Sequence, residues 1–167
     1  IEGVNDEESL RKEVEANIKA NKDMEEENKY IDKLLEEVSK NVEVDIPEEM
    51  VNEEVDRLLR RTEQQMAMQG ISLDLYYQVT KTTEKDLRDH LEKEAYQNVL
   101  YRLMLEEIMN MEHIEVTEDE AMEEAKRLAE RYQMELDDFL NQFGGIEMVQ
   151  YDQEMRKTIE LLKELNK

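Results

Sequence analysis

Hydrophobic and polar positions alternate with a helical period along almost the whole chain. Residues 6–40 are predicted to form one long helix, because their apolar residues follow a 3.5-residue repeat. Asn17, Asn21 and Asn28 occupy the middle of the same seam. The centre of this seam is therefore polar, and a simple coiled coil fits the segment poorly.

A second predicted helix follows the sequence NVEVDIP, residues 41–47. This link is expected to be extended, since the residue before a proline avoids the helical conformation. Pro47 is predicted at the first position of the helix and Gly70 at its end. The apolar stripe of this helix consists of Val51, Val55, Leu58, Leu59 and Met66. Ser72 is then predicted to cap a short apolar helix with the sequence LDLYYQV.

The third long helix begins with Thr83 as its cap, paired with Asp86 three residues later. Its early turns have one clean apolar side, whereas ten of the sixteen residues in 96–111 (YQNVLYRLMLEEIMNM) are apolar. A helix that is apolar nearly all round is either fully buried or apolar for another reason. We expect one side of residues 96–111 to pack and another to stay uncovered.

The same order of elements then recurs. HIEVTEDEAMEEA (residues 113–125) parallels NVEVDIPEEMVNEEV (residues 41–55), and Thr117 with Glu120 forms a capping box. Residues 132–143 parallel the earlier short helix, and two glycines precede a last helix over about 146–165. The predicted fold is all-α and elongated, with long antiparallel helix hairpins as protruding arms. We expect one domain over 1–167, with a first helix at 6–40 and hairpin units at 47–112 and 114–165.

Composition agrees with long helices and excludes several functions. The 167 residues are 40% charged and 39% apolar, with a net charge of −23 and no cysteine. One medium domain with a real core is expected at this length. Nucleic acid and anionic membrane surfaces are not expected as partners, because binding to phosphate needs clustered Lys and Arg. Because the chain begins with Ile1 and not with Met, we expect it to be part of a longer protein.

A catalytic or metal site is not predicted. Carboxylate-bridged metal sites in helical bundles use Glu-x-x-His, but Leu87 and Asn110 stand three residues before His90 and His113. Nucleotide-binding glycine patterns and calcium-binding loops are also absent from the sequence. The many glutamates are interpreted as solvated helix faces, so no cofactor and no metal are expected.

The remaining functional feature is apolar surface. The sequence contains eleven Met and seven Tyr, which could supply such a surface. Flexible Met side chains suit surfaces that accept varied partners. Uncovered apolar patches usually mark binding sites. We expect Leu58, Leu91, Val99 and Leu128 to pack in the interior. The candidate contact residues, each of which could instead belong to the core, are Met66, Met68, Ile71, Leu75, Tyr76, Tyr77, Tyr101, Met104, Leu105, Met109, Met111, Phe139 and Phe143.

Three stretches in this order resemble the C-terminal domain of bacterial trigger factor, a ribosome-associated chaperone. They are IPEEMVNEE (46–54), the turn MxxQGISLDxYY (66–77) and IEVTEDE (114–120), within a likeness that covers nearly all of residues 8–165. The resemblance implies a cytoplasmic, ATP-independent holder of unfolded or nascent polypeptides, whose helical arms form a cradle. The amino-acid sequence of this turn is most similar to that of trigger factors from low-GC Gram-positive bacteria.

The family's ribosome-docking domain and prolyl isomerase domain are not in this sequence. Ribosome contact and isomerase activity are therefore not expected of this chain by itself. A long helix of the family that contributes to the body is also missing, and the face it would cover could drive formation of a homodimer.

Two other classes remain open. A structural coiled-coil or adaptor module would bind one defined protein partner through a regular helical interface. An enzyme would need convergent carboxylate and histidine side chains, which the sequence pattern does not supply. Suppression of client aggregation distinguishes the chaperone from both alternatives.

Overall fold

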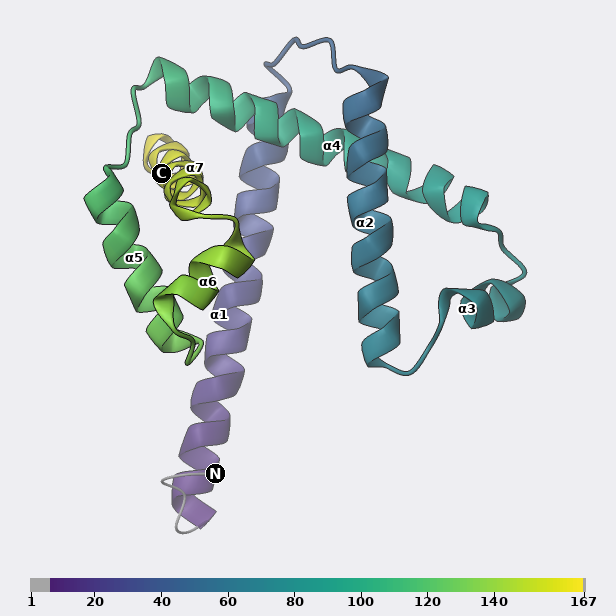
Figure 1. Cartoon of the computed structure of the whole chain (residues 1–167), viewed down its shortest axis with the longest axis horizontal. Helices are drawn as coiled ribbons and strands as arrows, with labels where there is room; N and C mark the ends of the chain where they lie inside the picture. Colours follow the sequence, from purple (N-terminus) through teal and green to yellow (C-terminus); the bar gives the residue numbers. More distant parts are fainter. Residues whose placement is uncertain (1–6, 167) are drawn as a thin grey trace. The chain divides into compact units, whose positions relative to one another are not determined.

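The computed structural model describes residues 7–166, and every regular element in that range is a helix (Figure 1). The all-α prediction is therefore confirmed. Asp6, where the first helix was expected to begin, lies outside the described residues. The helices are α1 (Glu7–Ser39), α2 (Glu48–Met68), α3 (Leu73–Thr80), α4 (Glu84–Met111), α5 (Glu118–Arg131), α6 (Leu136–Phe143) and α7 (Ile146–Leu165).

The chain divides into two compact units, and the division falls inside α7. The first unit comprises α1 and the end of α7, and the second comprises residues 42–158. Within the first unit, Lys163 on α7 forms ion pairs with Glu27 on α1 and, at 2.9 Å, with Glu160. The division follows contacts alone, so the expectation that residues 1–167 form one domain stays a prediction.

In the second unit, α4 crosses and packs against α2 (Figure 1). The apolar residues of α4 recur every four positions and so form one stripe, which meets the stripe of α2. Their shared core is a cluster of six buried residues: Val51, Val55, Leu58, Leu87, Leu91 and Ala95. The packing role predicted for Leu58 and Leu91 is confirmed, and Val99 and Leu128 are likewise buried.

A second core lies among α5, α6 and α7. Ala121, Ala125 and Ala129 are spaced four apart on α5, and such small side chains let neighbouring elements approach closely. They pack with Val116, Leu128, Phe139 and Val149. The repeated local plan of the sequence therefore produces two separate hydrophobic clusters.

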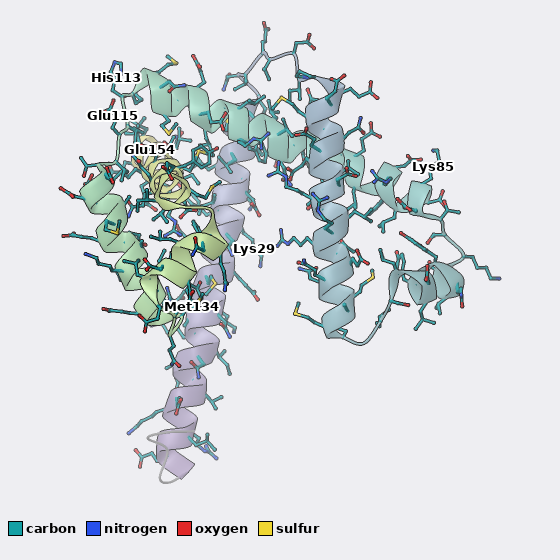
Figure 2. The ribbon with its side chains drawn as sticks, viewed as in Figure 1. Lys29, Lys85, His113, Glu115, Met134 and Glu154 are labelled. Atoms are coloured by element: carbon teal, nitrogen blue, oxygen red, sulfur yellow. The ribbon has the colours of Figure 1, made fainter. Side chains whose placement is uncertain are left out.

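The link before α5 is held by side chains of α7. Glu154 accepts a hydrogen bond from the backbone N–H of Val116 at 3.1 Å, and Gln150 donates one to the Val116 carbonyl at 2.5 Å. Lys157 reaches the Glu115 carbonyl at 3.5 Å, and Figure 2 shows Glu115 and Glu154 in this region. These bonds satisfy backbone groups that an extended link cannot pair within itself.

Helix starts agree closely with the sequence, with one correction. Thr83 with Asp86 and Thr117 with Glu120 form full capping boxes, and the Ser72 hydroxyl caps α3. Pro47 is not the first helical residue as predicted. Its ψ of 138° is extended, so Pro47 is the N-cap and the helix begins at Glu48.

Three helix ends share one hydrogen-bond pattern, the Schellman motif, in which a left-handed residue turns the chain back on the last helical turn. Gly70 ends α2 in this way, as predicted, with a φ of +74°. His113 and Gln133 hold the same position after α4 and α5, with φ of +53° and +55°. Glycine adopts this conformation without cost, whereas the other two residues store backbone strain.

Candidate binding surfaces at the two turns

The first turn, residues 66–80, joins α2 to α3 and keeps most of its apolar side chains in water. The backbone N–H of Ile71 bonds the Met66 carbonyl at 2.9 Å, which closes the Schellman motif. Met68 is 81% exposed and Val79 is 73% exposed, while Leu75 is about half exposed. Such exposure is unusual for side chains that gain free energy by leaving water.

Tyr76 and Tyr77 anchor the first turn. Their rings meet edge to face, with centroids 5.9 Å apart. Tyr77 packs against the α2–α4 cluster, and its buried hydroxyl has no hydrogen-bond partner among the described residues. Burial raises the pKa of Tyr77, and the negative charge of Glu84 adds to the effect. Tyr77 is therefore a half-buried support for the exposed residues around it.

The second turn, residues 132–145, is built around three aromatic rings. Tyr132 stacks on Phe139 with centroids 6.5 Å apart, and Phe139 stacks on Phe143 at 5.3 Å. Phe139 is only 5% exposed, whereas Tyr132 is 63% exposed. The middle ring thus belongs to the core and presents its two neighbours at the surface.

We call the three stacked rings of Tyr132, Phe139 and Phe143 the aromatic ladder. A hollow of about 340 Å³ lies beside it. Its wall is mainly apolar, and one charged residue, Arg156, stands among the lining residues. Arg156 is held by Asp152 at 2.7 Å and approaches Glu124 at 3.7 Å. A hydrogen bond from Arg127, followed by the charges of Arg127 and Arg156, lowers the pKa of Glu124. The residues that line the hollow are Leu128, Tyr132, Met134, Phe139, Gln142, Phe143 and Arg156.

The thirteen predicted contact residues divide into three groups by exposure. Those exposed to solvent are Met68, Ile71, Leu75, Met111 and Phe143. Those that are half-buried are Met66, Tyr76, Tyr77, Tyr101 and Met109. Met66 and Met109 supply the carbonyls that close two of the Schellman motifs.

The expectation of a surface position is wrong for Met104, Leu105 and Phe139. Each is at most 5% exposed, so none can touch a client in this fold. Met104 and Leu105 lie on the packed side of α4, and Phe139 is the middle ring of the ladder. Client contact stays a prediction for the other ten residues.

Residues 96–111 were expected to have one packed side and one uncovered side, and the structure agrees only in part. Val99 is fully buried, whereas Tyr96 is 44% and Met111 67% exposed. An open groove of about 600 Å³ on this part of α4 is lined by Tyr96 and Leu100 together with Ile46 and Val51. Most of the apolar excess in this segment is therefore core or half-buried, and its exposed parts are local.

Sequence reasoning missed two apolar residues of the turns, Tyr132 and Val79. Tyr132 continues the stripe of Ala121, Ala125 and Leu128 at helical spacing, and this pattern favours a packed position. In the structure the helix ends at Arg131, so Tyr132 is the C-cap and leaves the stripe. The available signal was its place just before a short apolar helix, where the chain must turn.

Among residues 7–166, no group of three or more His, Cys, Asp or Glu side chains is arranged to hold a metal ion. The helices of this part of the chain include none that is long and apolar enough to cross a membrane.

Residues 7–166 thus form an all-helical protein with two apolar turns on a strongly acidic chain. The family model for the C-terminus of bacterial trigger factor protein matches residues 7–164. The chain therefore belongs to the trigger factor C-terminal family, which confirms the resemblance found in its motifs. The matched model is that of the C-terminal part of trigger factor and not of its prolyl isomerase domain.

Similar proteins include the trigger factors of Bacillus thuringiensis (strain Al Hakam), Bacillus cereus (strain B4264) and Bacillus anthracis (strain A0248). Each is 36% identical to this chain over 155 residues. The matched region covers 93% of this chain and 36% of each relative, so the chain spans about a third of their length. No solved structure gives a significant match.

Proposed function

We propose that this chain binds apolar segments of unfolded or nascent polypeptides and shields them from aggregation in the cytoplasm, without using nucleotide. The observation that carries the proposal is the exposure of Met68, Leu75 and Val79 at the first turn and of Tyr132 and Phe143 at the second. Leu75 and Val79 lie on α3 and Phe143 on α6, while Met68 ends α2 and Tyr132 is the C-cap of α5. These side chains are therefore placed by helices and are not left on loose chain ends. Ordered apolar side chains in water are what a client segment can cover.

The energetics favour weak binding at several places. Apolar burial contributes about 25 cal/mol per Å², so covering one such side chain stabilises a complex by at most about 1.5–3 kcal/mol. Ordering a flexible client offsets much of this gain. A client would therefore need both turns for useful affinity and could leave either without an energy source. The net charge of −23 would keep the chain soluble while the turns are uncovered.

The proposal is tested by aggregation of a chemically denatured client, followed by light scattering with this chain at equimolar concentration. The test variant replaces Met68, Leu75, Tyr132 and Phe143 by Ser, and we expect it to lose most of the suppression shown by the original chain. Far-UV circular dichroism must show unchanged helicity. Absence of suppression by the unaltered chain would contradict the proposal.

A matched control keeps the test specific. Met24 is 60% exposed and Leu165 is 69% exposed, and both lie outside the two turns. Replacing both by Ser should leave suppression unchanged. Equal loss in this control would show that general surface hydrophobicity acts, and not the two turns.

A second candidate function is binding of one defined helical partner through α1. Leu10, Val14 and Ile18 are spaced four apart on α1, and each is exposed. Such a stripe can pair with a partner helix. Tight binding of a single partner with fixed stoichiometry, lost on replacing Val14 and Ile18 by Ser and without aggregation suppression, would favour this function.

A further inference from the structure

The helix that leads to the first turn carries a cluster of arginines in an otherwise acidic chain. The chain has 45 acidic and 22 basic residues. Yet Arg57, Arg60 and Arg61 together line one hollow of about 420 Å³. Its other lining residues are Glu54, Leu58 and Gln64 of α2 and Asn98 of α4, so Glu54 is its one carboxylate. A local cationic surface of this kind is the opposite of what the bulk composition predicts.

Two of these arginines have no carboxylate partner within the part of the chain that the structure describes. Arg57 contacts Glu54 at 2.5 Å, and Glu54 also accepts a hydrogen bond from Asn98 at 3.1 Å. Arg60 and Arg61 are exposed and form no ion pair with any carboxylate in residues 7–166. Arg57 and Arg61 are also four residues apart, a spacing at which like charges destabilise a helix. Ion pairing within the fold therefore accounts for Arg57 but not for Arg60 and Arg61.

The arginines lie in line with exposed apolar surface. At 100° per residue, Arg57, Arg61, Gln64 and Met68 fall on one face of α2. A rise of about 1.5 Å per residue places Met68 about 10 Å from Arg61 and about 12 Å from Arg60 along the axis. An extended peptide advances about 3.3 Å per residue, so these separations correspond to roughly three and four client residues.

We propose that Arg60 and Arg61, with Met68, form a docking strip for client segments in which carboxylates stand about three to four residues from an apolar anchor. The inference rests on the proposed function and names a client class for the first turn. The apolar anchor covers Met68, and client Asp or Glu side chains accept hydrogen bonds from the guanidinium groups. Arginine suits this role because its planar donors match a carboxylate in pairs.

Charge favours a client over a second copy of this chain as the occupant. Each copy carries a net charge of −23, so the approach of two copies is opposed by repulsion between whole molecules. An unfolded client brings only one short acidic stretch to the strip. The acidic residues elsewhere on this chain repel that stretch as well. The arginine cluster is therefore the place where the stretch can dock.

The test measures binding of three labelled peptides by fluorescence anisotropy at low ionic strength. The peptides share one apolar anchor and differ only in bearing Glu, Gln or Lys at the third and fourth positions after it. Each is titrated with the unaltered chain, with the Arg60→Gln/Arg61→Gln variant and with a Lys19→Gln/Lys22→Gln control. The control changes net charge equally at two exposed residues of α1.

The ratio of the Glu-peptide affinity to the Gln-peptide affinity should fall about fivefold in the Arg60→Gln/Arg61→Gln variant, as expected for exposed ion pairs. The control should keep the ratio of the unaltered chain, and the Lys peptide should not lose affinity in the arginine variant. Circular dichroism confirms that each variant is folded.

The inference is overturned if the ratio is the same in the unaltered chain and the arginine variant, a result that leaves the proposed function intact. Failure of every peptide to bind the unaltered chain would overturn both. Sedimentation in the same buffers measures whether the unaltered chain and the arginine variant form dimers. A dimer of the unaltered chain that the arginine variant abolishes would assign the strip to contact between copies and contradict the client assignment.

Discussion

The two turns follow one backbone plan but treat their apolar side chains differently. Each begins with a Schellman motif and continues into an eight-residue helix, α3 or α6. In the second turn α6 packs along α5 and places Phe139 in a core, whereas in the first repeat the main packing partner of α2 is α4. Docking of the short helix on its parent helix therefore decides whether apolar residues at the turn become core or surface.

The largest expected effect is on the stability of the second turn. Replacing Phe139 by Ala removes the middle ring of the ladder and leaves a cavity in the α5–α6–α7 cluster. We expect the free energy of unfolding to fall by about 3–5 kcal/mol, measured by urea denaturation.

The matched change in the first turn is Leu75→Ala. Leu75 is 47% exposed and lies on the corresponding short helix. Its replacement should change stability by no more than about 0.5 kcal/mol. Similar losses in both variants would show that α3 packs as firmly as α6 and would remove the contrast between the turns.

The second prediction separates client binding from stability. Replacing Met68 and Val79 by Ser should weaken binding of an apolar peptide about tenfold, or about 1.4 kcal/mol, with unfolding unchanged. Replacing Tyr132 and Phe143 by Ser should weaken binding too, but should also cost roughly 1 kcal/mol of stability for each lost ring contact. Peptide anisotropy and urea denaturation of the same samples give both quantities. The distinction fails if the first-turn variant loses as much stability as the second-turn variant.

The sequence was sufficient for what local chemistry determines and insufficient for what packing determines. Ser72, Thr83 and Thr117 were recognised as caps, because the capping residue and its partner lie within one turn of the chain. Burial of Leu91 and Val99 followed from clean stripes at helical spacing.

Periodicity could not place the residues on the broad apolar segment or at the turns. Met104 and Met111 carry the same side chain on the same helix, yet one is 3% and the other 67% exposed. The difference arises from which neighbouring elements cover each position, and the sequence pattern of α4 contains no record of that. Arg60 and Arg61 were overlooked because composition averages a local cationic cluster into a strongly acidic chain.

The third prediction uses the left-handed residue of each turn. Gly70 has a φ of +74°, and a Cβ added there meets nothing within 4 Å, so Gly70→Ala should cost about 1 kcal/mol through backbone strain alone. Gln133 has a φ of +55° at the equivalent position, and Gln133→Gly should stabilise the chain by about 0.5–1 kcal/mol. Thermal unfolding checks both. Destabilisation by Gln133→Gly would mean that its side chain, and not the backbone, sets the second turn.

The smallest expected effect concerns the two capping boxes, Thr83 with Asp86 at the start of α4 and Thr117 with Glu120 at the start of α5. Hydrogen bonds from Thr83 lower the pKa of Asp86, and the charge of Lys85 adds a smaller effect. Hydrogen bonds from Thr117, together with the charge of Lys157 and a hydrogen bond from it, lower the pKa of Glu120. A lowered folded-state pKa means that the carboxylate stabilises the fold above its unfolded pKa of about 4, and that this contribution is lost as pH falls through the folded value. We therefore expect the melting temperature to fall below about pH 4 and to fall less steeply in Asp86→Asn and in Glu120→Gln. Glu120→Gln should flatten the profile more than Asp86→Asn, because Lys157 of α7 lies 3.5 Å from Glu120 and stabilises its charged form. Equal dependence of the melting temperature on pH in the two variants would show that the second capping box gains nothing from α7. The two repeats would then be alike at these helix starts.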